Sequence, residues 1–328
     1  NYFNIKYALA LSSGTAALHL SLLAKNIKEG DEIIIPAFSY IATANVIELV
    51  NAKPVLVDVN MDDFCINTDK IEKVISKKTK AIMPVHEFGM PSNLDKLEKI
   101  SKKYNIELIE DCACAFGSKY KDKFVGAFGV SGCFSLHPRK TITSGEGGVL
   151  ITNKIKIYNY VKSMRSHGIN LDFKRDYIYA GLNYRMTEIQ AALGLNELNN
   201  YNKKLKYRLD IVKIYQQYLS EIKWIKIPNI MKNRKSIFQS YHIVIKNNVN
   251  RDHFIEYLNK NNIQAVIGAQ AIHEQSYYKK KYKFKKNDYP NASNLYHKGL
   301  CLPLGSHVKK KDVINIFNLI KKYEKKFI

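Results

Sequence analysis

The chain has 328 residues and carries 52 lysines and arginines against 29 aspartates and glutamates, which gives a formal net charge of +23 at pH 7. Its 46% of hydrophobic and 25% of charged residues are typical of a soluble globular protein, and its length predicts a large domain followed by a smaller one. No apolar run reaches the roughly 18 residues of a membrane span, and the first ten residues lack the features of a secretory signal, so we expect a cytoplasmic protein without a membrane partner.

The surplus of positive charge raises the question of a nucleic-acid partner. Most of it is lysine rather than arginine; it gathers at 279–286 and 309–311 and is otherwise spread along predicted helices. We therefore expect no nucleic acid. Two interpretations stay open for the lysines: a solvated surface, and a basic rim that attracts a nucleotide diphosphate.

The five cysteines are odd in number and scattered, which favours a reducing compartment over a disulfide framework; they are Cys65, Cys112, Cys114, Cys133 and Cys301. The pair at 112 and 114 does not have the C-x-x-C spacing of a zinc or redox site, and no second pair follows it. We expect no metal.

Short apolar runs alternate with helical patterns over the first half of the chain, which predicts a mostly parallel sheet wrapped by helices. The predicted strands are 32–36, 54–58, 81–85, 106–111, 133–136 and 148–152. The predicted helices are 15–25, 40–50, 69–76, 94–104 and 154–165. No G-x-G-x-x-G motif follows any of these strands, which argues against a nicotinamide dehydrogenase.

The second half begins with an irregular stretch at 170–180, after which Thr187 and Gln190 form a capping box for a helix at 188–199. A long amphipathic helix at 203–219 then leads into a smaller α+β domain. The elements predicted there are a strand at 240–245, a helix at 251–261, a strand at 264–267, an irregular loop at 276–289 and a helix at 311–322. We place the two domains at 1–221 and 222–328.

Four local features could carry chemistry, and each also has a plain structural interpretation. The turn from Ser12 to Ala17 opens a helix, whose N-terminal N–H groups can bind a phosphate or simply be capped by serine. Asp111 ends a strand, where a carboxylate can bind a protonated pyridine nitrogen or cap the strand. Tyr40 could cover a ligand or belong to the core, and His86 is at least as readily a structural histidine as a ligand-facing one.

Lys140 has unusual surroundings for a lysine. The segment from Cys133 to Gly148 reads as a buried strand, a break at Pro138 and a Ser/Gly turn into the next strand. Small and apolar neighbours leave the Lys140 side chain little room to reach water. Desolvation lowers the pKa of an ammonium group, so we expect Lys140 to become the neutral amine that forms Schiff bases.

The segment F-S-L-H-P-R-K followed by T-S-G-E-G-G resembles the cofactor-lysine segment of the DegT/DnrJ/StrS family. These are pyridoxal-phosphate (PLP) nucleotide-sugar aminotransferases with the aspartate-aminotransferase fold, also called fold type I. Other segments resemble the same family in the same order: S-G-T-A-A, V-H-x-F-G, E-D-x-A-x-A and N-Y-R. The resemblance covers nearly the whole chain.

The resemblance implies a role for each matching residue. Lys140 would bond covalently to PLP and move the substrate proton, and Asp111 would bind the pyridine nitrogen. Tyr40 would stack on the ring. The cofactor phosphate would be held by Gly14, Thr15, Ala16 and Ser135 of one subunit and by Asn183 of its partner. A homodimer with shared active sites follows from the last assignment.

Two departures from the family pattern stand out. Cys114 occupies a position where many members have glutamine near the ring oxygen of the cofactor, and a thiol is a weak donor, so we keep it as a ring-lining residue. Family members usually have a further segment before the residues that match 6–10 of this chain, and this chain begins almost at that match. This implies either a fragment or a short enzyme with altered substrate affinity. The loop at 268–273 is the best candidate for facing the substrate, although His273 could equally be structural.

The predicted activity is transfer of an amino group from an amino acid, with glutamate the expected donor, to a keto-sugar on a nucleotide diphosphate. The expected product is an amino sugar for a surface polysaccharide. Related sugar dehydratases have histidine where this chain has Lys140, which favours amino transfer. Two alternatives stay open: an aminotransferase of a small phosphorylated ketone, and a catalytically silent binding or regulatory module.

Overall fold

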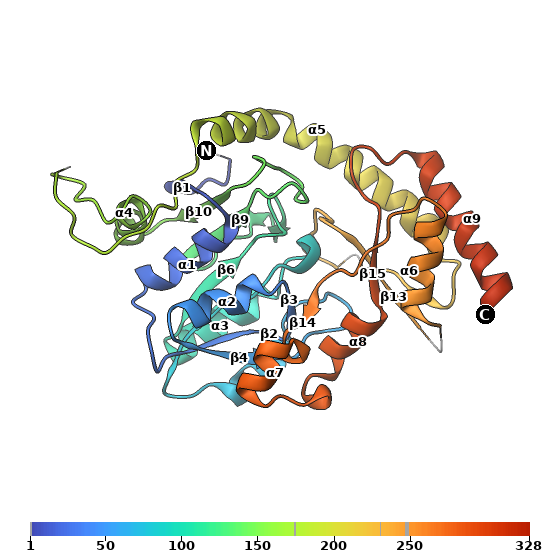
Figure 1. Ribbon diagram of the computed structural model, residues 1–328, viewed down its shortest axis with the longest axis horizontal. Helices are drawn as coiled ribbons and strands as arrows, with labels where there is room; N and C mark the ends of the chain where they lie inside the picture. The colour runs from blue at the N-terminus through green and yellow to red at the C-terminus, as the bar shows by residue number, and fades with distance from the viewer. Residues whose placement is uncertain (1, 174, 230, 247–248) are drawn as a thin grey trace.

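A seven-stranded sheet forms the centre of the computed structural model, which describes residues 2–173, 175–229, 231–246 and 249–328 (Figure 1). The strand order is β1-β10-β9-β6-β5-β2-β4. The bounds are β1 (Tyr7–Leu11), β2 (Glu32–Pro36), β4 (Lys53–Val57), β5 (Thr79–Ile82), β6 (Glu107–Asp111), β9 (Ser131–Ser135) and β10 (Gly148–Thr152). Strand β10 alone among these seven runs against the others, because both of its pairings are antiparallel. The predicted α/β fold with a mostly parallel sheet is therefore confirmed.

Helices cover both faces of this sheet, as the nearly continuous apolar run of β2 requires. Ile33 and Ile35 of β2 pack in the core beneath α1 (Gly14–Ala24), α2 (Ala42–Leu49) and α4 (Ile155–Met164), whereas Ile34 packs in the core beneath α3 (Leu94–Tyr104). Successive side chains of a strand point to opposite faces, so one strand serves two cores.

The segment predicted as a helix at 69–76 is instead two 3-10 turns, η1 (Thr68–Lys70) and η2 (Glu72–Val74). Ile75 has extended backbone angles, and the N–H of Ser76 donates to the hydroxyl of Thr79. These contacts turn the chain into β5, which starts two residues before its predicted position, so a regular helix cannot continue there.

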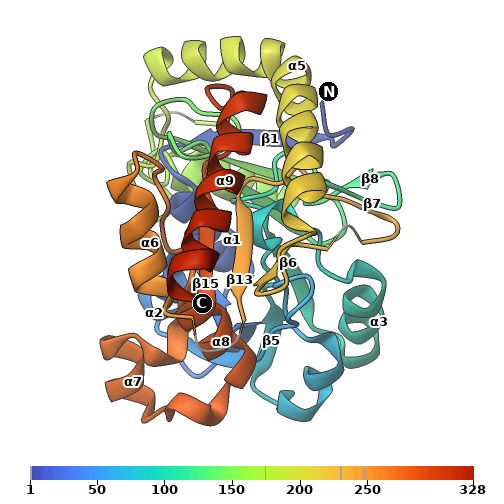
Figure 2. The same ribbon diagram turned by 90° about the vertical axis from the view of Figure 1, so that its right-hand side faces the viewer.

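A second sheet, β11-β13-β15, is antiparallel and lies beside the first part of the chain. Its strands are β11 (Ile225–Lys226), β13 (Tyr241–Ile245) and β15 (Gly299–Leu302). Helices α6 (Arg251–Lys260) and α9 (Lys310–Phe327) and the end of α5 (Glu188–Leu219) pack around it (Figure 2). The strand predicted at 264–267 is wrong: Val266 forms an isolated bridge to Cys301, and the rest of that segment is irregular.

Helix α5 is a single element of 32 residues, where the pattern predicted two helices. The joining residues include Tyr201, whose buried ring packs against Phe116 and whose hydroxyl donates to the Phe116 carbonyl. This tertiary contact keeps the helix continuous across 200–202.

The segment predicted as an irregular loop at 276–289 is largely helical. It contains α7 (Ser276–Tyr282) and η5 (Lys286–Asp288), and α8 (Pro290–Lys298) follows. The hydroxyls of Tyr278 and Tyr282, one turn apart, donate to Asn45 and Glu48 of α2. Packing against α2 thus provides the helix with partners that its own sequence does not reveal.

The remaining short elements join these parts. Strand β14 (Gln270–Ala271) pairs with β3 (Phe38–Ser39), and a small sheet has the order β12-β7-β8. Its strands are β7 (Lys119–Tyr120), β8 (Lys123–Phe124) and β12 (Arg234–Lys235), and the other 3-10 turns are η3 (Glu87–Gly89) and η4 (Ile272–Glu274). None of the helices in the described ranges is long and apolar enough to cross a membrane.

Candidate active site

The residues predicted to carry chemistry come from the carboxyl ends of the parallel strands. Asp111 ends β6 and Ser135 ends β9, and Tyr40 directly follows β3, the short strand after β2. Ligands of open α/β sheets bind at this edge because the strands diverge there and the helix N-termini point towards it. The site therefore lies where the topology favours one.

The N-terminus of α1 forms a cradle beside the end of β9. The hydroxyl of Ser13 accepts a hydrogen bond from the N–H of Ala16 at 3.0 Å, which starts the helix at Gly14. A Cβ atom on Gly14 would lie 2.8 Å from the Cβ of Ser135, so only glycine allows this approach. Free N–H groups at a helix N-terminus bind anions, and Thr15 is exposed beside them.

Asp111 is buried and held by two hydrogen bonds. Its Oδ2 atom accepts from the Thr43 hydroxyl at 2.9 Å, and its Oδ1 atom accepts from the N–H of Ala113 at 3.0 Å. The Thr43 hydroxyl in turn lies 3.0 Å from that of Ser39. Burial raises the pKa of Asp111, so a cationic partner would stabilise its carboxylate. Sequence reasoning missed both hydroxyls, Ser39 at the end of β3 and Thr43 in the first turn of α2.

Glu110 points to the opposite side of β6, where it braces the fold. One carboxylate oxygen accepts from the N–H groups of Phe128 and Gly129, and the other from the N–H of Gly126 and from His86. The Nδ1 atom of His86 accepts from the N–H of Ser92, so Nε2 carries the proton and donates to Glu110. His86 is therefore a structural histidine.

Cys112 lies close enough to His86 and Glu110 for the three side chains to share an ion, with all ligand atoms within 4.8 Å of one another. Backbone N–H groups donate to both oxygens of Glu110 and to Nδ1 of His86, and Nε2 of His86 donates to Glu110. Burial raises the pKa of the Cys112 thiol well above its ordinary value, which disfavours the thiolate that a metal needs. The donor set fits a hydrogen-bonded cluster.

Lys140 lies in the turn after β9, where its Nζ atom donates to the sulfur of half-buried Cys114 at 3.1 Å. Burial lowers the pKa of the Lys140 ammonium, but the Cys114 sulfur and the carboxylates of Glu87 and Asp111 raise it by more. The net pKa of Lys140 is raised, so the predicted lowering is wrong for the cofactor-free protein. The reason is that three electron-rich groups from other segments surround the amine.

Glu87 is a residue of this site that sequence reasoning missed. It follows His86 in the strand-end segment, and its carboxyl is buried with an Oε2 atom that has no hydrogen-bond partner among the described residues. Burial raises the pKa of Glu87 to about 8, while Lys140 lowers it and Asp111 raises it. An acidic residue beside a histidine at a strand end was the only signal.

Tyr40 and Asn183 are both exposed, at different parts of the surface. Tyr40 lies two residues before α2, and its carbonyl accepts from the N–H of Thr43, whose hydroxyl donates to Asp111. Asn183 forms an isolated bridge with Ser166 and lies next to Tyr184, whose carbonyl accepts from the N–H of Ser12. Asn183 is thus near the cradle of α1, but the described contacts do not join its side chain to Lys140.

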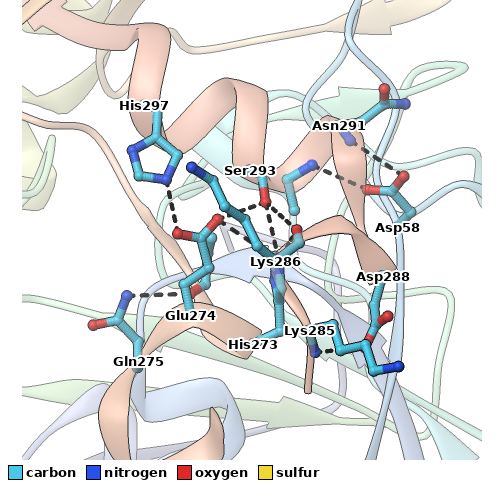
Figure 3. A network of polar contacts seen from close by, with 12 residues as sticks. Asp58, His273, Glu274, Gln275, Lys285, Lys286, Asp288, Asn291, Ser293 and His297 are labelled. Carbon is cyan, nitrogen blue, oxygen red and sulfur yellow. Dashed lines mark hydrogen bonds and ion pairs between the residues drawn. The ribbon is translucent and has the colours of Figure 1, made fainter.

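His273 belongs to a separate polar network, drawn in Figure 3. Its Nε2 atom lies 3.0 Å from the Ser293 hydroxyl, and Ser293 and His297 both donate to Glu274, at 2.5 and 2.7 Å. Asp58, just after β4, accepts from the N–H of Ala292. These bonds anchor α8 to the first sheet, so the structural interpretation of His273 holds.

The fold and the site define an enzyme of the α/β transferase class. A model of the DegT/DnrJ/EryC1/StrS aminotransferase family matches residues 1–321, and the chain belongs to that family. The predicted family resemblance is thereby confirmed, and the chain is an aminotransferase.

Similar proteins agree with this placement. GDP-perosamine synthase from Escherichia coli O157:H7 is 34% identical over 323 residues, which cover 98% of this chain and 86% of that protein. The PLP form of the putative sugar aminotransferase Spr1654 from Streptococcus pneumoniae has a TM-score of 0.93 and 28% identity, covering 100% of this chain and 89% of that one. PseC from Helicobacter pylori, an aminotransferase of pseudoaminic acid biosynthesis, has a TM-score of 0.92 and 28% identity, covering 99% and 88%.

Proposed function

We propose that the protein is a PLP-dependent aminotransferase that moves an amino group from L-glutamate to the keto group of a nucleotide-linked sugar. The observation that carries the proposal is the position of Lys140 Nζ, 3.1 Å from Cys114 in the same cluster as the buried carboxyl of Asp111. The sugar and nucleotide classes are suggested by the relatives named GDP-perosamine synthase and by the similarity to PseC. The same relatives support a role in making an amino sugar, and we propose a surface polysaccharide as its destination.

The residues present fit PLP. The cradle that a Cβ on Gly14 would fill suits a phosphate, and a buried carboxylate suits a protonated ring nitrogen. When bound, PLP supplies the electron sink that lets an amino group leave one substrate and join another.

The protein side chains supply binding, orientation and proton movement. The N–H groups of Gly14, Thr15 and Ala16, with the Ser135 hydroxyl, would hold the phosphate. Thr43 orients Asp111, which would keep the ring nitrogen protonated, and Tyr40 would cover the ring. Lys140 would bind the cofactor and would take the proton from the donor's α-carbon as a general base. Cys114 would line the ring edge as a weak donor.

We also propose a homodimer in which Asn183 reaches the partner's site. Large apolar side chains are exposed along the chain between α4 and α5 and on the first half of α5; examples are Tyr177, Ile178, Ile189 and Leu195. Figure 1 shows this part of the chain looping away from the sheet, with the start of α5 projecting beyond it. A surface of this kind normally marks a protein contact, and a two-fold contact would place the exposed Asn183 of one subunit near its partner.

Two further predictions stay proposals. We divide the chain into a cofactor-binding unit at 1–221 and a smaller unit at 222–328, supported by the separate core around β11, β13 and β15. Residues 270–298 of the smaller unit nevertheless pack on α2 and β3 of the larger one. We also propose a cytoplasmic location, which the five unpaired cysteines support.

The test combines absorbance with a substrate panel. Incubation with PLP should produce a visible absorbance band that Lys140→Ala lacks, and L-glutamate should discharge it. Keto-sugars linked to GDP, UDP or dTDP should then restore the band, with one nucleotide strongly preferred. A protein that forms the band but responds to none of these sugars would overturn the substrate class, and a protein without the band would overturn the PLP chemistry.

A further inference from the structure

Two buried glutamates on neighbouring strand ends have opposite surroundings. Both oxygens of the Glu110 carboxylate accept hydrogen bonds, three of them from backbone N–H groups at 2.7 to 2.8 Å. The carboxyl of Glu87 is only 3% exposed, yet its Oε2 atom has no partner among the described residues. An unsatisfied buried oxygen is costly, so the fold accounts for both oxygens of Glu110 but not for the Oε2 atom of Glu87.

The backbone holds Glu87 in this position. The two residues after it have left-handed angles, with φ values of 51° at Phe88 and 88° at Gly89. A Cβ atom on Gly89 would lie 3.1 Å from the carbonyl oxygen of Cys114, and the Phe88 carbonyl accepts from the N–H of Gln239. The turn is thus wedged between the Cys114 loop and a later segment, and the Glu87 side chain cannot swing out to water.

The groups that face Glu87 come from four parts of the chain. Lys140 carries the positive charge, whereas Asp111 of β6, Cys114 after β6 and Cys301 of β15 are acids or thiols. Burial raises the pKa of each of these three. The Ser39 hydroxyl of β3 lowers the pKa of Glu87 through a hydrogen bond. His86, next in the chain, already donates to Glu110. Lys140 is therefore the one cation among the described groups that act on the Glu87 carboxyl.

We propose that Glu87 is a positioning residue that sets the protonation of the Lys140 nitrogen and, resting on the proposed function, the pH range in which that nitrogen can attach the cofactor. Each of the two groups changes the other's affinity for a proton. A charged Glu87 stabilises the Lys140 ammonium, and the ammonium favours loss of the Glu87 proton. Any change in the charge of the Lys140 nitrogen therefore changes how strongly Glu87 holds its proton.

The experiment measures Lys140 directly in the cofactor-free protein. Trace labelling with acetic anhydride modifies only neutral amines, and peptide mass spectrometry separates Lys140 from the other lysines. At pH 9, where Glu87 is charged, Glu87→Gln should label faster at Lys140, by about tenfold for each unit by which the pKa falls. At pH 6.5, where Glu87 holds its proton, the variant and the parent should label equally.

Glu32→Gln is the matched control because it makes the same chemical change at the amino end of β2, where Glu32 contacts Lys53 and Ser76 and not Lys140. It should leave Lys140 labelling unchanged at both pH values. The parent protein provides a second measurement if Glu87→Gln does not fold. Its logarithmic labelling rate should rise less steeply between about pH 7 and 9, as Glu87 acquires its charge.

Equal labelling of the parent and Glu87→Gln at pH 9, or a parent profile of constant slope, would overturn the proposal. A spectroscopic reading extends the test to the loaded enzyme: the pH midpoint of the visible cofactor band should move down in Glu87→Gln and not in Glu32→Gln. Because the labelling needs neither PLP nor substrate, a protein that shows the labelling effect but binds no PLP would overturn the proposed function instead.

Discussion

The amine of Lys140 donates to the thiol of Cys114 across 3.1 Å, and the two groups approach from the ends of neighbouring strands. Burial raises the pKa of the Cys114 thiol, so at neutral pH it is a neutral group beside Lys140. The edge of the site at this point is therefore poorer in hydrogen-bond donors than an amide would make it.

Cys114→Gln should accordingly bind PLP more tightly, because an amide can donate a hydrogen bond where a thiol barely can. One added hydrogen bond of about 1 kcal/mol corresponds to a roughly fivefold lower dissociation constant. Spectrophotometric titration of the cofactor-free protein would measure it. Cys65→Ser, at a buried thiol bonded to the Met90 carbonyl, is the control and should not change PLP affinity. Weaker PLP binding by Cys114→Gln would show that the small volume of the thiol matters more for affinity than its weakness as a hydrogen-bond donor.

Asp111→Asn should retain PLP through the phosphate cradle but slow the half-reaction with glutamate by at least about a hundredfold. A neutral amide cannot keep the ring nitrogen protonated, and losing one pre-organised partner of a developing charge typically has this size of effect. Stopped-flow absorbance after mixing with glutamate gives the rate. Thr43→Val, which removes the hydroxyl that orients the same carboxylate, should have a smaller effect in the same direction. An unchanged rate in Asp111→Asn would contradict the pyridine-nitrogen role.

Mixed dimers test whether Asn183 acts across the interface. Lys140→Ala and Asn183→Asp should each be defective, the second because a carboxylate repels the cofactor phosphate. If Asn183 acts in trans, both lesions fall on one site of the mixed dimer and the other site is native, so heterodimers purified with two tags should recover about half the native activity.

Mixing Lys140→Ala with Asp111→Asn is the control for this complementation. Both of those residues serve their own subunit, so each site of that heterodimer keeps one lesion and activity should stay low. Recovery in the first pair and not the second would support the shared site. Equal lack of recovery, in heterodimers shown to have formed, would refute the trans assignment.

The buried carboxyl of Glu87 should make stability depend on pH. Its pKa is raised from 4.5 to about 8 in the folded protein, so folding disfavours its charged form. Stability from this group is greatest below its unfolded pKa and is lost as the pH rises through about 8. The free-energy difference between Glu87→Gln and the parent should therefore grow in favour of the variant, by on the order of 3 kcal/mol from pH 5.5 to 8.5. Denaturant unfolding of both cofactor-free proteins measures it, and a constant difference would contradict the raised pKa.

Much of the site could be predicted because its residues lie in short, contiguous segments of the sequence. Gly14, Asp111, Ser135 and Lys140 each lie at the junction of a strand or helix with a turn, and such junctions have strong local signals in apolar runs, glycines and prolines. The Ile-rich strand β2 likewise follows from composition alone, since a run buried on both faces must be apolar throughout.

What only the tertiary structure decided depends on partners far apart in the chain. The tyrosines of α7 fold as a helix because α2 offers Asn45 and Glu48, more than two hundred residues earlier. The Lys140 pKa is raised rather than lowered because Cys114, Glu87 and Asp111 converge on it from two other segments. Glu87 could not be recognised from its neighbours in sequence, because the absence of a partner for one oxygen is a property of everything packed around it. Local pattern thus determined which residues stand at the strand ends, and desolvation and charge in the folded chain determined how those residues are protonated.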